Sequence, residues 1–242
     1  MGMELIERIS WILYGATIFL SLFLSYQFFK KVKTGESNKF WFGLATFSLL
    51  FAVSFIIWII GDTFLAFSES ANIIIIAEFN LTYILLWKIS LAIIFSALAL
   101  FMFALESEII RKTKYLLSIF VGLTPLIVLL GAPHYEIIEV SFLRFIPPIS
   151  IFSNVYYIIS LNIVIWITLF LYGRIAITVP EHRFNSLGVG LGILLLALGK
   201  TMSFRITDFI FLNEDLEMLL SGFCLFLGFI LIYFGFSHRL RE

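Results

Sequence analysis

The stretch FWFGLATFSLLFAVSFIIWIIGDTF, residues 40–64, decides the class of fold because Asp62 is its one charged residue. A helix needs about 20 consecutive, mostly apolar residues to cross the hydrocarbon core of a bilayer. The stretch is solidly apolar rather than alternating, which argues against a strand of a membrane β-barrel. The sequence therefore predicts a transmembrane helix at this position.

The same pattern recurs along the whole chain. The predicted spans are residues 9–29, 40–64, 81–105, 115–131, 149–172, 187–204 and 216–236. The first is longer than the core of a signal peptide, and we predict that it is retained as a helix. We therefore predict an all-α fold in which residues 1–242 form a single domain, a bundle of seven transmembrane helices in a multi-pass protein of the cell membrane.

Composition agrees with this class. Of the 242 residues, 61% are hydrophobic and 13% are charged, whereas soluble domains carry about 25% charged residues. The formal net charge is zero and no basic face is available, which argues against nucleic-acid binding. Cys224 is the one cysteine, so neither a disulfide framework nor a thiolate metal cluster is expected.

The basic residues predict the orientation of the chain in the membrane. Eleven of the 16 Lys and Arg residues fall in alternate loops or at the C-terminal end: Lys30, Lys31, Lys33, Lys39, Arg111, Lys112, Lys114, Arg174, Arg183, Arg239 and Arg241. Because loops rich in Lys and Arg stay in the cytoplasm, we predict that the N-terminus is outside and the C-terminus is cytoplasmic. That arrangement requires an odd number of spans.

Ionisable residues within or beside the predicted spans are the first candidates for function, because charge in the bilayer is costly. They gather towards the predicted outer side, where a ligand-binding pocket would comprise Asp62, Trp87, Lys88, Lys200, Arg205 and Asp208. In this hypothesis Lys88 or Lys200 meets an anionic ligand or pairs with Asp62. The alternative is that these side chains extend to the interface or form structural ion pairs.

Residues for catalysis or for a cofactor are not gathered in any span. We therefore expect no enzyme activity, no catalytic residues, no cofactor and no metal site. A retinal protein would need a lysine in its last helix, and residues 216–236 contain none. One alternative is a cation bound by His134 with Glu136 and Glu139 in the predicted outer loop; a solvated surface is the other interpretation.

Two features of the spans bear on how the helices pack. The sixth span contains the small residues Ser186, Gly188, Gly190 and Gly192. They form two pairs at four-residue spacing, 186/190 and 188/192, which permits close approach of a neighbouring backbone. Pro125 is predicted to kink the fourth span, because its ring removes one helical hydrogen bond.

Several short patterns resemble the seven-transmembrane sensor module found at the N-terminus of many prokaryotic histidine kinases and cyclases. These patterns are Leu85-Leu86-Trp87-Lys88 and FMFALE (residues 101–106) in the third span, Trp58 and Gly61 in the second, and Asp215-Leu216 and GFSHRL (residues 235–240) in the last. Two departures stand out. The basic residue after the tryptophan is more often Arg in that family, and its members usually continue into a cytoplasmic output domain.

The resemblance implies a stand-alone sensor or receptor-like protein that binds a small molecule or a lipid from the outer side and signals through a partner protein in the cytoplasm or the membrane. The basic cytoplasmic loops would meet that partner or anionic membrane lipid. Two other hypotheses remain open: a non-catalytic membrane subunit of a larger complex, and a small transporter or channel.

Overall fold

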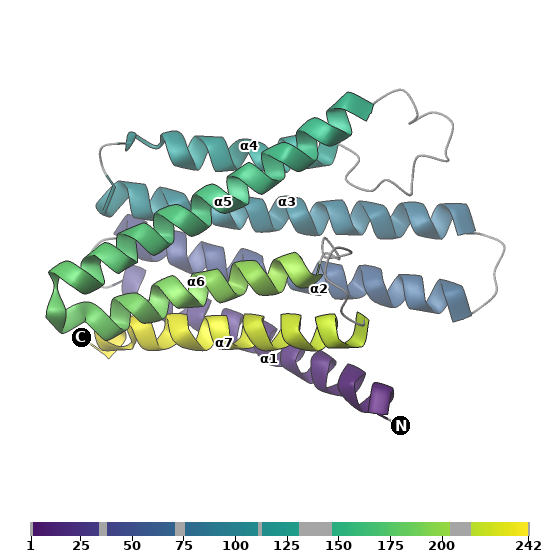
Figure 1. The fold of residues 1–242 in the computed structure, drawn as a ribbon, viewed down its shortest axis with the longest axis horizontal. Coiled ribbons are helices and arrows are strands. Elements are labelled where there is room, and N and C mark those ends of the chain that lie inside the picture. The colour runs from purple at the N-terminus through teal and green to yellow at the C-terminus, as the bar shows by residue number, and fades with distance from the viewer. Residues whose placement is uncertain are drawn as a thin grey trace. The chain divides into compact units, whose positions relative to one another are not determined.

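A computed structural model of the protein describes residues 2–33, 38–70, 76–110, 113–130, 147–203 and 214–241, and these residues contain no strand (Figure 1). The helices are α1 (Gly2–Val32), α2 (Asn38–Ser70), α3 (Ile76–Glu108), α4 (Leu116–Leu130), α5 (Pro147–Thr178), the short 3₁₀ helix η4 (Pro180–His182), α6 (Arg183–Ser203) and α7 (Glu214–Arg241). The all-α prediction is confirmed.

Within the described residues, six helices, all except α4, are long and apolar enough to cross a membrane. The helices mostly extend beyond the predicted spans, because hydropathy marks the hydrocarbon core whereas a helix continues into the polar interface. As described, α4 has 15 residues, or about 22 Å at 1.5 Å per residue, less than the thickness of about 30 Å for a hydrocarbon core. A multi-pass membrane protein is therefore supported, and the seventh crossing stays a prediction.

The chain divides into two compact units, one of residues 1–28 with 162–242 and one of residues 29–161. In the second unit α2 packs against α3 and α3 packs against α4. Ser54 and Ser90 join α2 to α3, because each fully buried hydroxyl donates to the other residue's carbonyl oxygen, at 2.9 and 2.8 Å. These bonds satisfy polar groups that lipid cannot.

The described part of α4 is held to α5 by two polar contacts. The hydroxyl of Thr124 donates to that of Ser160 over 2.8 Å, and the Tyr156 hydroxyl donates to the carbonyl oxygen of Phe120 over the same distance. Pro125 lies within α4, beside Thr124. Its predicted kink stays a prediction.

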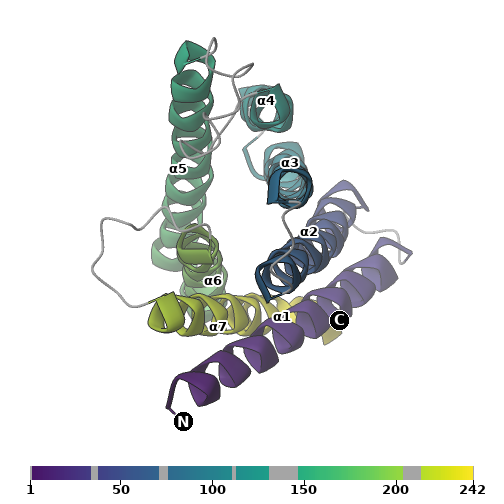
Figure 2. The same ribbon diagram turned by 90° about the vertical axis from the view of Figure 1, so that its right-hand side faces the viewer.

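In the other unit α6 and α7 form a closely packed pair (Figures 1 and 2), and Figure 1 shows that the two helices run antiparallel. A Cβ added to Gly192 would lie 2.6 Å from the carbonyl oxygen of Gly228, so the two backbones nearly touch. The closest backbone approaches pair Asn185 with Gly235, Gly192 with Gly228 and Gly199 with Ser221. Each side repeats every seven residues, which keeps one seam of small residues facing the partner helix.

The small residues predicted in the sixth span serve two neighbours rather than one. Gly188 and Gly192 face α7 as a pair four residues apart, which confirms the predicted close approach. Gly190 instead faces α5, where an added Cβ would lie 3.4 Å from the Cβ of Tyr172. Four-residue spacing alone therefore describes the seam less well than the seven-residue repeat.

Helix α1 runs parallel to α7 within the same unit. Midway along α1, the buried Tyr14 donates a hydrogen bond of 3.0 Å to the carbonyl oxygen of Met218, near the start of α7. Near its end, the Phe28 ring meets that of Phe236 edge to face at 5.7 Å. The order of the contacts is the same along both helices, so their N-terminal ends lie on the same side.

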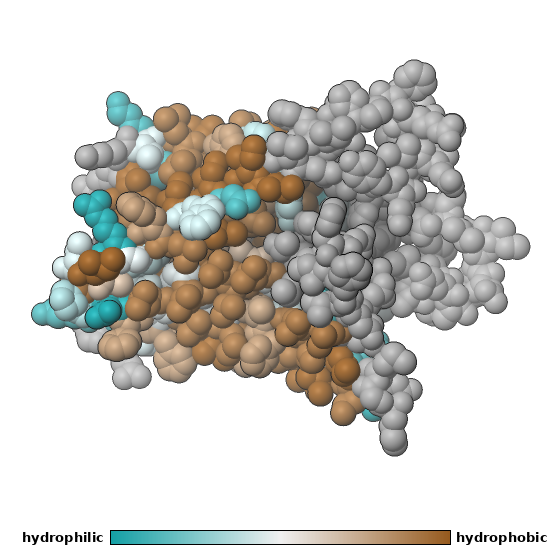
Figure 3. All heavy atoms as spheres, viewed as in Figure 1, coloured by the Kyte–Doolittle hydropathy of each residue, from teal (hydrophilic) through white to brown (hydrophobic). Residues whose placement is uncertain are grey.

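Much of the surface is apolar, as expected for side chains that face lipid. On the face shown in Figure 3, hydrophobic residues dominate the coloured atoms. Large exposed side chains include Phe19 at 73%, Trp166 at 67% and Ile177 at 83% of their maximal exposure. Such exposure would be a liability in water and is ordinary in a bilayer.

Candidate functional site

Three of the six predicted site residues lie in the unit of residues 29–161. Asp62 belongs to α2, whereas Trp87 and Lys88 belong to α3. Lys200 lies in α6, in the other unit, and Arg205 and Asp208 lie outside the described residues. The two groups are therefore described separately, and the single outer pocket that joins them stays a prediction.

On α2 and α3 the serine pair gives the relative depth of the charged residues. Asp62 lies eight residues beyond Ser54, and Lys88 lies two residues before Ser90 on the antiparallel helix. At 1.5 Å per residue, Lys88 is about 9 Å nearer to the serine pair than Asp62 along the helices. Trp87 is buried, and both charged side chains are half-buried. Lys88 is thus the deeper group.

Lys200 is the most buried of the predicted site residues whose side chains are described, at 6% exposure. It lies one residue after Gly199, where an added Cβ would be 2.9 Å from the carbonyl oxygen of Ser221 on α7. The Ser221 hydroxyl donates to the carbonyl oxygen of Gly199 over 2.8 Å. The lysine is therefore held at the point where the α6 and α7 backbones are in contact.

Sequence reasoning missed the role of Glu106, which it quoted only as the last residue of FMFALE. The side chain is 2% exposed and accepts hydrogen bonds from the backbone N–H groups of Leu117, at 3.1 Å, and Ser118, at 2.8 Å. The Ser118 hydroxyl also donates to it. Glu106 thus ties the end of α3 to the first turn of α4, where a carboxylate also complements the helix dipole.

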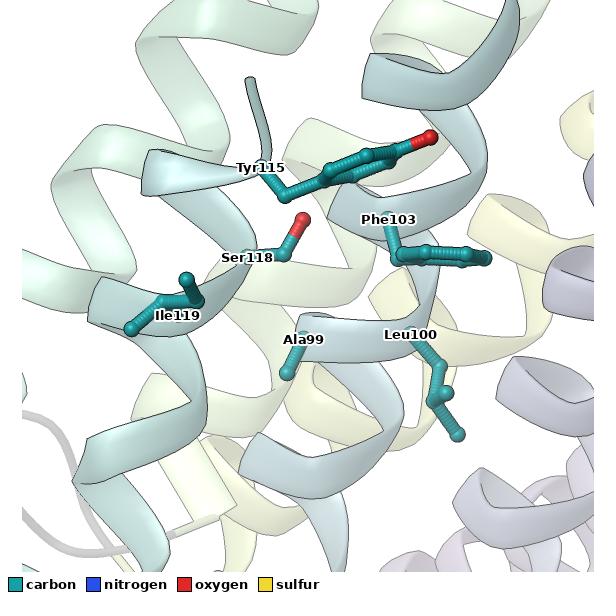
Figure 4. Close-up of a pocket in the computed structure, with 6 residues that line it drawn as sticks. All are labelled: Ala99, Leu100, Phe103, Tyr115, Ser118 and Ile119. Carbon is teal, nitrogen blue, oxygen red and sulfur yellow. The ribbon is translucent and has the colours of Figure 1, made fainter. Parts of the chain in front are cut away.

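An apolar groove lies beside this contact, between α3 and the start of α4 (Figure 4). Its lining comprises Ala99, Leu100, Phe103, Tyr115, Ser118 and Ile119, and its volume is about 370 Å³. The Phe103 and Tyr115 rings stack at 5.1 Å between centroids, and Ile119 is 59% exposed. We call this feature the α3–α4 groove; hydropathy alone could not locate it, because its residues are ordinary apolar side chains in sequence.

A metal site in the described part of the chain would need several ligating side chains close together. The described residues contain no group of three or more His, Cys, Asp or Glu side chains that could hold an ion. The alternative site of His134, Glu136 and Glu139 lies outside the described residues. Cys224 is a single half-buried thiol on α7.

Comparisons with known proteins add no family to these observations. No protein-family model matches the chain, no curated protein is similar enough to match it, and no solved structure matches its fold. The functional argument therefore rests on the residues themselves.

Proposed function

We propose that the protein is a membrane sensor that binds a small anionic molecule or a lipid near Lys200 and signals through a partner protein on its basic side. The observation that carries the proposal is the burial of the Lys200 side chain in a helix that is apolar enough to span a membrane. The resemblance of the third and seventh helices to prokaryotic sensor modules supports it.

Burial of a lysine in this position has an energetic cost. Insertion of Lys at the centre of a membrane helix costs about 2.5–3.5 kcal/mol, which falls towards the interface. A methionine or leucine would fill similar space in the α6–α7 pair without that cost. An anion that meets the ammonium group would offset the penalty, and its binding would favour whichever helix packing brings the two together.

The neighbouring residues provide a route from Lys200 to the opposite end of the protein. Gly199 contacts α7 at Ser221, and the same seam continues through Gly192 and Gly228 towards the C-terminal end of α7. A seam in which glycine residues bring the two backbones close together has little room to absorb a displacement at one position. We infer that a shift at Lys200 alters the packing of α6 on α7 along its length.

Distance measurements between two spin labels by double electron–electron resonance test this proposal. Spin labels at Phe184→Cys and Leu216→Cys, in a Cys224→Ser background, occupy exposed positions near opposite ends of the α6–α7 pair. In nanodiscs we expect the distance distribution to change on addition of octanoate or phosphate, or of phosphatidylglycerol to the bilayer. Lys200→Met should abolish the change, whereas Lys39→Met, at an exposed lysine of α2, should preserve it.

The outcome that contradicts the proposal is a distance distribution that Lys200→Met leaves unaltered under every one of these conditions. Purification provides a second test. Co-purification with other integral membrane chains in fixed stoichiometry would favour the subunit hypothesis, whereas a discrete monomer or homodimer agrees with a sensor.

A further inference from the structure

We infer that the α3–α4 groove is a binding site for one phospholipid with an anionic headgroup, whose acyl chain lies in the groove and whose phosphate meets Lys114. The inference is independent of the proposed sensor function, because it concerns other residues and the opposite, basic end of the predicted topology. It rests on the shape of the groove, its lining and the charge at its end.

The groove has the size and lining that an acyl chain requires. Its volume of about 370 Å³ falls within the range of about 300–1,000 Å³ typical of small-molecule sites. Ala99 leaves space on α3 where a larger residue would fill the groove, and Phe103 with Tyr115 forms an aromatic wall at one end (Figure 4). The one polar lining side chain, Ser118, already donates to Glu106.

The charge next to the groove favours an anionic headgroup. Lys114 is exposed, directly precedes Tyr115 and has a φ of 48°, so that the chain turns sharply between α3 and α4. Arg111 and Lys112 belong to the same connection in sequence. A basic residue at a membrane surface attracts anionic lipid, and an interfacial tyrosine places its polar end among headgroups.

The headgroup must be bound by side chains rather than by the start of α4. The N–H groups of Leu117 and Ser118 are occupied by the Glu106 carboxylate. That carboxylate is 2% exposed and directed at these amides, so it is shielded from a phosphate outside. Lys114 is therefore the described side chain that provides the positive charge.

Photo-crosslinking of the full chain in phosphatidylcholine nanodiscs tests the site. The probe is phosphatidylglycerol with a diazirine in one acyl chain. We expect enriched crosslinks in residues 99–103 and 115–119, and competition by unlabelled phosphatidylglycerol but not by phosphatidylcholine. Lys114→Asn removes the charge with a residue that tolerates positive φ, and should lower crosslinking about fivefold, the factor expected for one basic contact with anionic lipid.

Matched variants separate the site from general lipid contact. Lys39→Asn, at an exposed lysine of α2, should leave crosslinking at these segments unchanged. Ala99→Phe fills the groove and should redirect crosslinks to other helices, whereas Ala16→Phe on α1 should not. Only variants that elute as monodisperse as the wild type in size-exclusion chromatography are compared, so that a misfolded variant is not mistaken for a loss of binding. Equal crosslinking by a phosphatidylcholine probe, or by the Lys114→Asn variant, would overturn the inference.

Discussion

Glu106 joins two helices through one side chain. Its carboxylate accepts the N–H groups of Leu117 and Ser118, which have no partner within the first turn of α4. Such bonds to a charged acceptor are stronger than those between neutral groups. The contact explains how the chain can turn sharply at Lys114 and Tyr115 while the first amides of α4 keep a hydrogen-bond acceptor.

We predict that Glu106→Ala lowers the free energy of unfolding by about 2 kcal/mol, because one buried and one partly buried amide lose a charged acceptor. Glu106→Gln should lose less, since it keeps one carbonyl oxygen. Titration of the detergent-solubilised protein with dodecyl sulfate, followed by tryptophan fluorescence, measures both. The control Glu181→Ala, at an exposed residue of η4, should change stability by less than about 0.5 kcal/mol. Equal stability of Glu106→Ala and the wild type would contradict this role.

Sequence reasoning reached some of these residues and not others. Lys200 and Lys88 could be selected because charge within an apolar span is conspicuous. Glu106 lies at the end of a span, where acidic residues are ordinary, and its partners follow 11 and 12 residues later. Only the turn between α3 and α4 brings them together, and hydropathy does not encode that turn.

The α6–α7 pair packs through a regular seam of small residues. Small residues alternate across it at intervals of seven, with Gly192 facing Gly228 and Gly199 facing Ser221. The four-residue spacing within the sixth span predicted close packing correctly. It could not identify the partner helix, because that information lies in the matching repeat Ser221, Gly228 and Gly235 of α7.

Alanine substitutions distinguish the seam from other glycines. We predict that Gly192→Ala destabilises the protein by about 1–3 kcal/mol, because its Cβ would lie 2.6 Å from a backbone oxygen and a helix must shift. A Cβ added to Gly173 would have no neighbouring atom within 4 Å, so Gly173→Ala should stabilise α5 by about 0.5–1 kcal/mol. Unfolding in dodecyl sulfate compares the two. A neutral Gly192→Ala would show that the seam is looser than described.

For the whole molecule, the parallel arrangement of α1 and α7 bears on the number of crossings. If both helices cross the membrane in the same direction, the chain crosses an odd number of times in total. Among the described residues six helices meet the length and hydropathy required, so an odd total predicts that α4 provides the remaining crossing. The basic loops independently predict an odd number. The apolar class of the protein follows from composition, whereas this arrangement follows only from contacts between distant segments.

The sequence could predict only part of the outer pocket. Its members were chosen by charge and depth along each helix, and such a pattern cannot determine which helices are neighbours. The structure gives Lys200 a buried position against α7 and gives Lys88 a deeper position than Asp62. Arg205 and Asp208 lie outside the described residues, so the complete set remains a hypothesis.

Both proposals use the predicted orientation of the chain, which places Lys200 towards the outer side and Lys114 at the cytoplasmic side. Single cysteines in a Cys224→Ser background, reacted with a membrane-impermeant maleimide in intact cells, measure it most directly. We predict that Glu4→Cys reacts in intact cells, whereas Glu181→Cys and Glu242→Cys react only after permeabilisation. Reaction of Glu4→Cys and Glu242→Cys from the same side would contradict an odd number of crossings and the orientation on which the account depends.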